Sequence, residues 1–412
     1  MSVLRRRGVA PLLTAEVVSS FGSQMSYLAL PWFVLVTSGS ATRMSVVLAV
    51  ELIPVALLGV PSGMLIARLG ARRTMLLGDA ARAPLMASIP ALYSLGALSF
   101  PLLLVIACAI GCFVAPYFSA QRLILPELVG DDERTVSQAN AFVEGAQRAT
   151  ALLGPSTAGV LISVIGATAV LYVDAATFVF SFFTLLLLVP QGAPQPASDE
   201  GRGVLAGVRF VFRDPLLRMI APTALVLNGL GQLLTISLPV LAYLDFGGSA
   251  RIAGIFFASF GAGAVVGSLV AIKLAPRFDP IKLAAAALVG LTVPIPLLAL
   301  HLPAWGVVGA LFVSSLFGPL VNAPLIGVIT TRTPAALRAK VMTALLTFAL
   351  LAGPIALFLG GPLLQAIGPH WVFLIVAGGQ ILASIPFATA AFRSDSRLVS
   401  PAAAETSASG TG

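Results

Sequence analysis

Long apolar runs recur along the whole chain, separated by short polar or glycine-containing stretches. A membrane-spanning helix needs about 20 mostly apolar residues, and twelve runs approach or exceed that length. They are continuous rather than alternating, which excludes a β-barrel. We predict spans at residues 11–37, 44–67, 74–95, 98–120, 136–165, 167–190, 216–244, 250–274, 281–300, 304–330, 341–367 and 370–391. The pattern therefore indicates an all-α membrane protein with twelve transmembrane helices.

The composition excludes a water-soluble fold. The 412 residues are 58% hydrophobic and 10% charged, with a mean hydropathy of +1.01, whereas soluble domains carry about a quarter charged residues. The two cysteines, Cys108 and Cys112, lie four residues apart in one apolar run, a spacing that indicates helix packing rather than a disulfide framework or a metal site. We expect neither a metal nor another cofactor.

The basic residues fall mainly in alternate loops. If the N-terminus is cytoplasmic, twenty of the 24 lysine and arginine residues lie in the two termini and the cytoplasmic loops, and only Arg43 and Arg251 lie outside. Such an asymmetry sets membrane orientation. It predicts a multi-pass protein of the cytoplasmic membrane with both termini in the cytoplasm. The net charge of +8 thus follows from topology and does not indicate nucleic-acid binding.

Residues 191–215 divide the spans into two sets of six, an N-terminal half at 1–190 and a C-terminal half at 216–391. "PQGAPQPASDEG" is typical of a flexible linker. "VLAGVRFVFRDP" predicts a short interfacial helix. In that helix Val204, Leu205, Val208 and Phe212 would face lipid, and Arg202, Arg209 and Arg213 would face water. The tail, residues 392–412, is predicted to be disordered in the cytoplasm.

The two halves carry similar segments. "GPSTAGVLISVIGATAVLY" (154–172) is similar to "GGPLLQAIGPHWVFL" (360–374), so that Gly159 matches Gly361 and Gly166 matches Gly368, both 202 residues apart. Internal repeats of this kind are typical of secondary transporters built around a midplane site. We therefore predict two pseudo-symmetric six-helix halves.

The stretch "GMLIARLGARR" (63–73) resembles the signature between spans 2 and 3 of the major facilitator superfamily. The matching positions are Gly63, Leu65, Arg68, Gly70, Arg72 and Arg73. Further segments, among them "SSFGSQMSYLALPWFVLVTSGSA", "GDAARA" and "YVDAATFVFSF", resemble the third drug:proton antiporter group, which holds macrolide-efflux-like and siderophore-exporter-like proteins. The resemblance implies a monomeric transporter, not an enzyme, that exports an amphipathic small molecule by proton antiport with alternating access.

One position departs from that signature. Ala67 stands where the superfamily has an acidic residue that latches spans on the cytoplasmic side. Asp79 is a candidate replacement that could meet Arg72, Arg73 or Arg122. Alternatively, Asp79 pairs with Arg82 on its own helix, because residues three apart are neighbours on a helix surface.

Ionisable residues inside spans are costly and are therefore candidate functional groups. They are Glu16, Glu51, Asp79, Arg82, Glu144, Arg148 and Asp174. Glu51 has no basic residue nearby in sequence, which favours a proton carrier, although a structural hydrogen bond to another helix is the alternative. Glu144 and Arg148 are spaced as an intrahelical ion pair, either static or opened by substrate or protons. We expect Asp174 to serve packing or gating, and Glu16 to reach water at the cytoplasmic end.

The resemblance also places polar side chains of spans 1, 4, 7 and 10 around a substrate cavity. These are Gln24, Tyr27, Tyr117, Asn228, Gln232 and Asn322. Interhelical hydrogen bonds are the alternative for each. Gly154 and Pro155 in "GAQRATALLGPSTAG" (145–159) resemble the antiporter glycine–proline motif, and proline bends a helix by removing a backbone donor.

Three alternatives to drug export remain open at this point. The chain could be a dedicated exporter of a siderophore or self-made metabolite, an uptake symporter, or a non-transporting sensor or partner subunit. An enzyme is disfavoured because no nucleophile–base or metal constellation is visible in the sequence. No phosphate-binding loop for ATP occurs either.

Overall fold

The computed structural model describes residues 8–129, 133–191, 204–214, 217–334 and 337–392. Residues 192–203 of the predicted linker and residues 393–412 of the predicted disordered tail lie outside this part of the chain.

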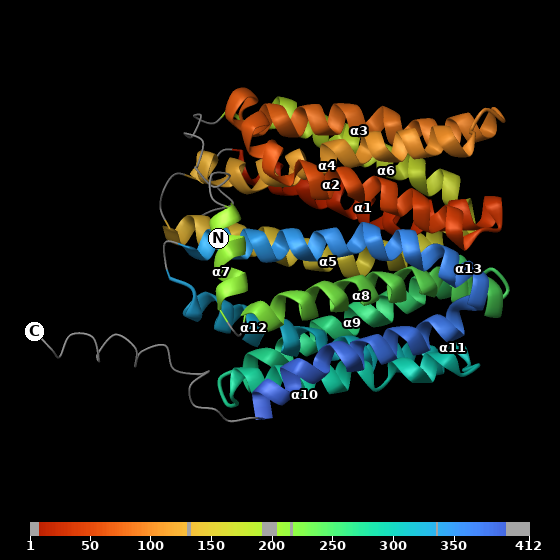
Figure 1. Ribbon diagram of the computed structural model, residues 1–412. Helices are drawn as coiled ribbons and strands as arrows, with labels where there is room; N and C mark the ends of the chain where they lie inside the picture. Colours follow the sequence, from red (N-terminus) through yellow and green to blue (C-terminus); the bar gives the residue numbers. More distant parts are fainter. Residues whose placement is uncertain (1–7, 130–132, 192–203, 215–216, 335–336, 393–412) are drawn as a thin grey trace, which may run out of the picture. The chain divides into compact units, whose positions relative to one another are not determined.

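All regular secondary structure in the described residues is helical (Figure 1). The elements are α1 Val9–Ser38, α2 Ala41–Leu69, α3 Ala71–Ser94, α4 Phe100–Val129, α5 Glu133–Ile165, α6 Ala167–Leu188, α7 Val204–Arg213, α8 Leu217–Asp245, α9 Ala250–Leu274, α10 Pro280–Thr292, the 3₁₀ helix η3 Ile295–Ala299, α11 Ala304–Leu316, α12 Gly318–Arg332 and α13 Arg338–Phe392. The prediction of an all-α membrane protein is confirmed.

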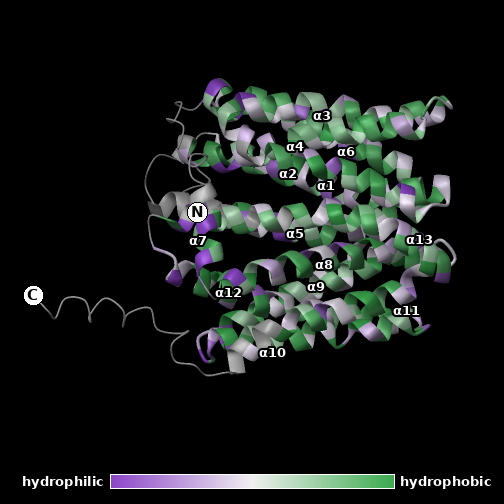
Figure 2. Ribbon diagram, viewed as in Figure 1, coloured by the Kyte–Doolittle hydropathy of each residue, from purple (hydrophilic) through white to green (hydrophobic). Residues whose placement is uncertain are grey.

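Nine helical stretches of the described chain are long and apolar enough to cross a membrane. Figure 2 shows hydrophobic residues along the lengths of the helices and hydrophilic residues at many of their ends. Helices α1 and α3 are not among the nine, because polar and charged side chains lower their hydropathy. The predicted span 281–300 is formed by α10 and η3, and the span 304–330 by α11 and α12, which meet at Phe317.

Three glycines join consecutive helices without a loop. Gly70, between α2 and α3, and Gly166, between α5 and α6, both have φ 82° and ψ 158°. Gly368 interrupts α13 with φ 77° and ψ 170°. Glycine tolerates positive φ because it has no Cβ. The matched pair Gly166 and Gly368 thus has the same backbone role in both repeats, and α13 holds the predicted spans 341–367 and 370–391.

The chain divides into two compact units. Unit 1 comprises residues 1–201, 232–261 and 353–372, and unit 2 comprises 202–231, 262–352 and 373–412. These units do not follow the two halves of the sequence, so the division at the 191–215 linker stays a prediction.

In unit 1, helices α1–α6 lie alongside one another (Figure 1), with α1 packed on α5 and α6, and α4 packed on α2 and α3. Their buried core includes Leu12 of α1, Met75 of α3, Ile124 of α4 and Leu185 of α6.

Two glycine crossings attach later helices to this bundle within unit 1. A Cβ atom on Gly159 of α5 would lie 2.6 Å from Cα of Gly254 on α9, and a Cβ atom on Gly361 of α13 would collide with the side chain of Ser45 on α2. Gly159 and Gly361 are equivalent in the sequence repeat. Each therefore marks a place where a helix of one half of the sequence contacts a helix of the other half, as pseudo-symmetry requires.

Unit 2 contains the predicted interfacial helix, α7. Its side chains Arg209, Phe212 and Arg213 are exposed, whereas Val211 is fully buried in a core that includes Leu217. The helix is therefore fixed by a valine that the sequence pattern did not single out. The side chains of Arg202, Val204 and Leu205 are outside the described residues.

Candidate functional site

The arginine-rich segment 63–73 contains the end of α2 and the start of α3, and one of its arginines caps the end of α6. Arg72, in the first turn of α3, donates from Nε to the carbonyl oxygen of Leu185 (3.2 Å) and from Nη2 to that of Leu186 (2.7 Å). These carbonyls belong to the last turn of α6, where cations are favoured by unpaired carbonyls and the helix dipole. Arg72 is thus bound by backbone carbonyl oxygens rather than by a carboxylate. It has these partners although Ala67 stands where the superfamily signature has an acidic residue. Gly63, Arg68 and Arg73 are exposed.

Asp79 forms its described ion pair and hydrogen bonds with Arg82 and Ser181, not with Arg72 or Arg73 of the segment 63–73. Its Oδ1 accepts from Arg82 Nη2 at 2.7 Å, and its Oδ2 accepts from Ser181 of α6 at 2.6 Å. The Arg82 guanidinium lies between the rings of Tyr117 and Phe178, 4.1 Å and 4.4 Å from their centroids. Of the two arrangements predicted for Asp79, the structure shows the pair with Arg82 on its own helix. The cluster joins α3 to α4 and α6 through buried contacts, in which both oxygens of Asp79 are hydrogen-bonded.

Glu51 lies partly buried on α2, at a close crossing where its own backbone carbonyl meets Gly111 of α4. Its carboxyl group forms no hydrogen bond or ion pair with any residue that the structure describes. It is within electrostatic range of Tyr27 on α1 and of Asp174 on α6. Asp174 is fully buried and accepts a hydrogen bond from Thr177 at 3.3 Å. Two predicted site residues, Glu51 and Tyr27, are therefore within electrostatic range of each other, and Glu51 is also within range of an acid that we assigned to packing or gating.

Glu144 and Arg148 form the ion pair that their spacing predicts. Oε1 of Glu144 and Nη2 of Arg148 are 2.9 Å apart, and both side chains are about two-thirds exposed, at 67% and 66%. No further ion pair or hydrogen bond to either side chain is formed by the residues that the structure describes, so no described neighbour fixes the pair in the closed form.

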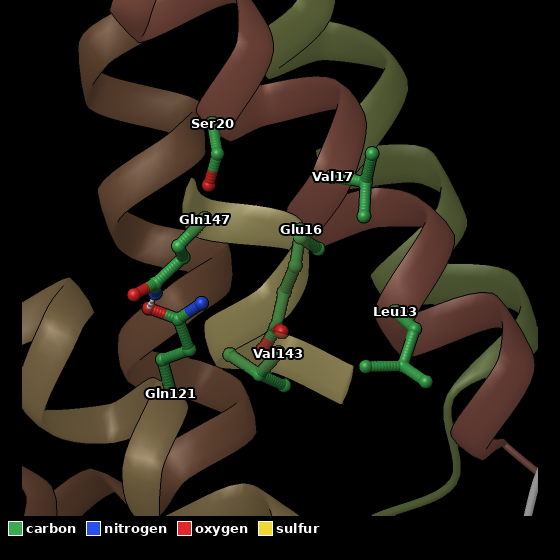
Figure 3. Close-up of a pocket in the computed structure, with 8 residues that line it drawn as sticks. Leu13, Glu16, Val17, Ser20, Gln121, Val143 and Gln147 are labelled. Carbon is green, nitrogen blue, oxygen red and sulfur yellow. Dashed lines mark hydrogen bonds between the residues drawn. The ribbon is translucent and has the colours of Figure 1, made fainter. Parts of the chain in front are cut away.

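A small cavity between α1, α4 and α5 contains a residue that sequence reasoning misplaced (Figure 3). Glu16, expected to reach water, is only 3% exposed, and both of its carboxyl oxygens lack a hydrogen-bond partner among the described residues. Its side chain projects from α1 toward Val143. Gln121 of α4 and Gln147 of α5 lie beside it, with Gln147 Nε2 donating to Gln121 Oε1 at 3.4 Å.

The remaining predicted cavity residues are dispersed. Gln24 packs against Gly154, where a Cβ atom would collide with it. Tyr117 is buried in the Arg82 cluster. Asn228 is exposed and donates to the carbonyl oxygen of Ala224 on its own helix (2.9 Å). Gln232 is partly buried, and Asn322 is exposed. Their role in substrate binding stays a prediction.

Gly154 and Pro155 are both buried in α5. Gly154 allows α1 to approach closely at Gln24 and Met25. The pair therefore sets the α1–α5 distance two turns from Glu16, a local packing function that accompanies any bend.

Comparison with known proteins places this architecture in a family. The family model described as Major Facilitator Superfamily matches residues 12–293 and 223–410. The chain is similar to the "Multidrug efflux pump Tap" of Mycolicibacterium fortuitum, with 27% identity over 93% of this chain and 96% of that protein. It is also similar, at 27% identity over 89% of both chains, to the protein of that name from Mycobacterium bovis (strain BCG / Pasteur 1173P2). The crystal structure of the nucleoside transporter NupG shares the fold, with a TM-score of 0.74 at 13% identity, over 93% of this chain and 99% of that one. The chain belongs to the Major Facilitator Superfamily, a family of membrane transporters rather than enzymes.

Proposed function

We propose that this transporter exports an amphipathic organic compound, a drug or a secondary metabolite, by proton antiport with alternating access. The observation that carries the export direction is similarity over nearly the full length to proteins described as multidrug efflux pumps. Length coverage matters here because the substrate path of a secondary transporter is formed by both repeats.

Proton coupling is supported by Glu51. A carboxyl group inside a span, without a cationic partner, can change its charge without first breaking an ion pair. Its neighbours Tyr27 and Asp174 offer no positive charge either. A proton arriving at Glu51 therefore removes a charge that the surroundings do not balance, which is the change that can favour one conformation over another. Glu144 is the second candidate, because its ion pair with Arg148 is exposed and free to open.

The first test measures accumulation of macrolides, dyes and siderophores in cells with and without the protein, each with and without a protonophore. We expect lower accumulation of at least one compound, abolished by the protonophore. If only siderophores respond, the protein is a dedicated siderophore exporter. No response to any compound contradicts drug export and favours a sensor or partner subunit.

Glu51→Gln then tests the coupling residue. We expect this variant to lose uphill export while retaining substrate binding, because glutamine keeps the shape of the neutral acid. Full uphill export by Glu51→Gln contradicts the assignment to Glu51 without affecting the export proposal. Glu144→Gln, measured in parallel, ranks the two candidates.

We also propose a monomer in the cytoplasmic membrane with both termini in the cytoplasm. The support is the distribution of basic residues, since twenty of 24 fall in the termini and loops predicted for one side. Fluorescent-protein and alkaline-phosphatase fusions to the C-terminus test the orientation, since the first is active in the cytoplasm and the second outside it.

A further inference from the structure

The cavity around Glu16 is a polar site inside an apolar helix bundle. It is lined by Leu13, Glu16, Val17, Ser20, Gln121, Val143, Ala146 and Gln147. The carboxyl group points into it, and the two glutamine side chains form the opposite wall (Figure 3). The Gln121 side chain lies near Glu16 but forms no hydrogen bond with it, and both carboxyl oxygens lack a partner among the described residues. An orphaned carboxyl group aimed into a cavity needs a physical explanation.

Among the side chains that the structure describes, no cation on the helices packed around Glu16 compensates its charge. The charged or titratable groups that the structure describes on these helices in this region are Tyr117 and Arg122 of α4, Glu144 and Arg148 of α5, Asp79 and Arg82 of α3, and Asp174 of α6. Arg82 and Arg148 are held by Asp79 and Glu144, respectively. Arg122 is exposed, and a phenol such as that of Tyr117 carries no positive charge in either protonation state. The described side chains around Glu16 therefore provide no available positive charge.

The lack of any hydrogen bond from a described residue to the Glu16 carboxyl oxygens bears on the charge of this group. An ionised carboxylate has about four acceptor sites to fill. The cavity volume is about 10 Å³, which is close to the space for a single water molecule. None of the described lining donors forms a hydrogen bond with the carboxyl oxygens of Glu16, and one water can fill at most two of the four sites. An ionised carboxylate would therefore stay largely uncompensated, whereas a protonated carboxyl group carries no charge and needs one acceptor for its O–H, which the water provides.

The same volume excludes larger occupants. A drug molecule does not fit in a space for one water. A bound metal cation requires a shell of about six oxygen ligands, whereas the polar lining consists of Glu16, Ser20 and the two glutamines, of which Gln121 already accepts from Gln147. The cavity can therefore hold a water molecule and a proton bound to the Glu16 carboxyl group, but neither a drug nor a fully coordinated metal ion.

The site lies on one side of a close crossing of α1 and α5. The two helices are in contact at Gln24 and Gly154. Glu16 is eight residues before Gln24 and Gln147 is seven before Gly154, so the cavity is about 10–12 Å along the helices from that crossing. A small change in the α1–α5 angle about Gly154 would therefore separate Glu16 from Gln147 and admit water.

We propose that Glu16 is a second proton-binding site, closed over its proton by Gln121 and Gln147 in this conformation and opened to water by divergence of α1 from α5. This inference rests on the proposed proton antiport, and it adds a site distinct from Glu51. Glu16 is two turns from the start of α1, whereas Glu51 is on α2 beside Tyr27 and Asp174.

The test is infrared difference spectroscopy of the purified full-length protein in lipid nanodiscs, titrated with pH in the absence of any substrate. The C=O stretch of a protonated carboxyl group is separate from the bands of a carboxylate. We expect a component of this stretch to persist at neutral pH in the wild type and to be lost in Glu16→Gln. Glu144→Gln, which removes an exposed and paired acid of the same bundle, should keep that component. Glu51→Gln should keep it too.

A second variant keeps the carboxyl group in place. Gln147→Lys puts an ammonium group opposite Glu16, so Glu16 should ionise and the same component should disappear although no acid was removed. If Glu16→Gln or Gln147→Lys leaves the wild-type band unchanged, Glu16 does not hold the proton and the proposal is wrong. Because no transport is measured, failure of dye or macrolide export would not affect this result.

Discussion

The Asp79–Arg82 pair offers the sharpest energetic prediction. Asp79 is 0% and Arg82 5% exposed, and the two groups are 2.7 Å apart. We consider three variants, Asp79→Leu, Arg82→Met and the double variant. Each single change leaves one buried charge without its partner, whereas the double change leaves none.

The burial and geometry set the magnitude. Removing one member of a buried ion pair typically costs about 3–5 kcal/mol of unfolding free energy, while replacing both with apolar residues of similar volume is often neutral or stabilising. Arg82 also stacks between Tyr117 and Phe178, contacts that a methionine side chain can partly replace through its sulfur. We therefore expect each single variant to lose about 3–5 kcal/mol and the double variant to lose less than either.

The assay is thermal unfolding of the purified variants in one detergent, followed by tryptophan fluorescence at a fixed heating rate, since unfolding of such proteins is often irreversible. Ser181→Ala is a control for the loss of a single hydrogen bond from the same cluster. It removes the 2.6 Å hydrogen bond to Asp79 but no charge, and should cost about 1–3 kcal/mol. If the losses of the two single variants simply add in the double variant, the pair is not energetically coupled and the reasoning fails.

Two further predictions concern packing. Arg72→Ala should lower the unfolding temperature, with a loss of about 1–2 kcal/mol of unfolding free energy, because the last carbonyls of α6 lose two donors. The control is Arg73→Ala, which removes the exposed neighbouring arginine. An equal loss in both variants would show that the contacts with α6 do not contribute to stability. Gly159→Ala should destabilise by about 1–3 kcal/mol through overpacking, since its Cβ would lie 2.6 Å from Gly254 and 2.7 Å from the Ala250 carbonyl oxygen. Gly145→Ala, on the same helix with open space around it, should be neutral or stabilising by up to about 1 kcal/mol, and the same sign of shift in both variants would contradict the close crossing.

The features that the sequence predicts best are those set by local spacing. Apolar runs identify the helices because a bilayer requires length and hydrophobicity in one continuous segment. The Asp79–Arg82 and Glu144–Arg148 pairs follow from the helical period alone. Gly166 and Gly368 share a backbone conformation because one repeat unit is built twice.

The features that the sequence misses depend on which helices are neighbours. Glu16 is near the start of its helix, a position that suggests contact with water, but α4 and α5 cover it. Gln121 and Gln147 come from different spans, so their pairing has no local pattern. The partners of Arg72 are 113 and 114 residues away and are backbone carbonyls, which carry no side-chain signature. A polar residue within an otherwise apolar run is the one clue available for such groups.

The fold is pseudo-symmetric, but its buried charge is not. Among the described residues, the buried ionisable side chains below one-tenth exposure are Glu16, Asp79, Arg82, Asp174 and the phenol of Tyr117, and all lie in α1–α6. In the helices from α8 onward, the buried polar side chains that the structure describes are neutral, such as Ser237, Thr292 and Gln380. Repetition of the backbone can therefore conserve the glycine crossings, which depend on helix geometry, without conserving the acids, which depend on chemistry. If protons drive export, this asymmetry locates their binding in the first six helices, and variants of the buried polar groups in later helices should alter stability or substrate preference without changing proton binding.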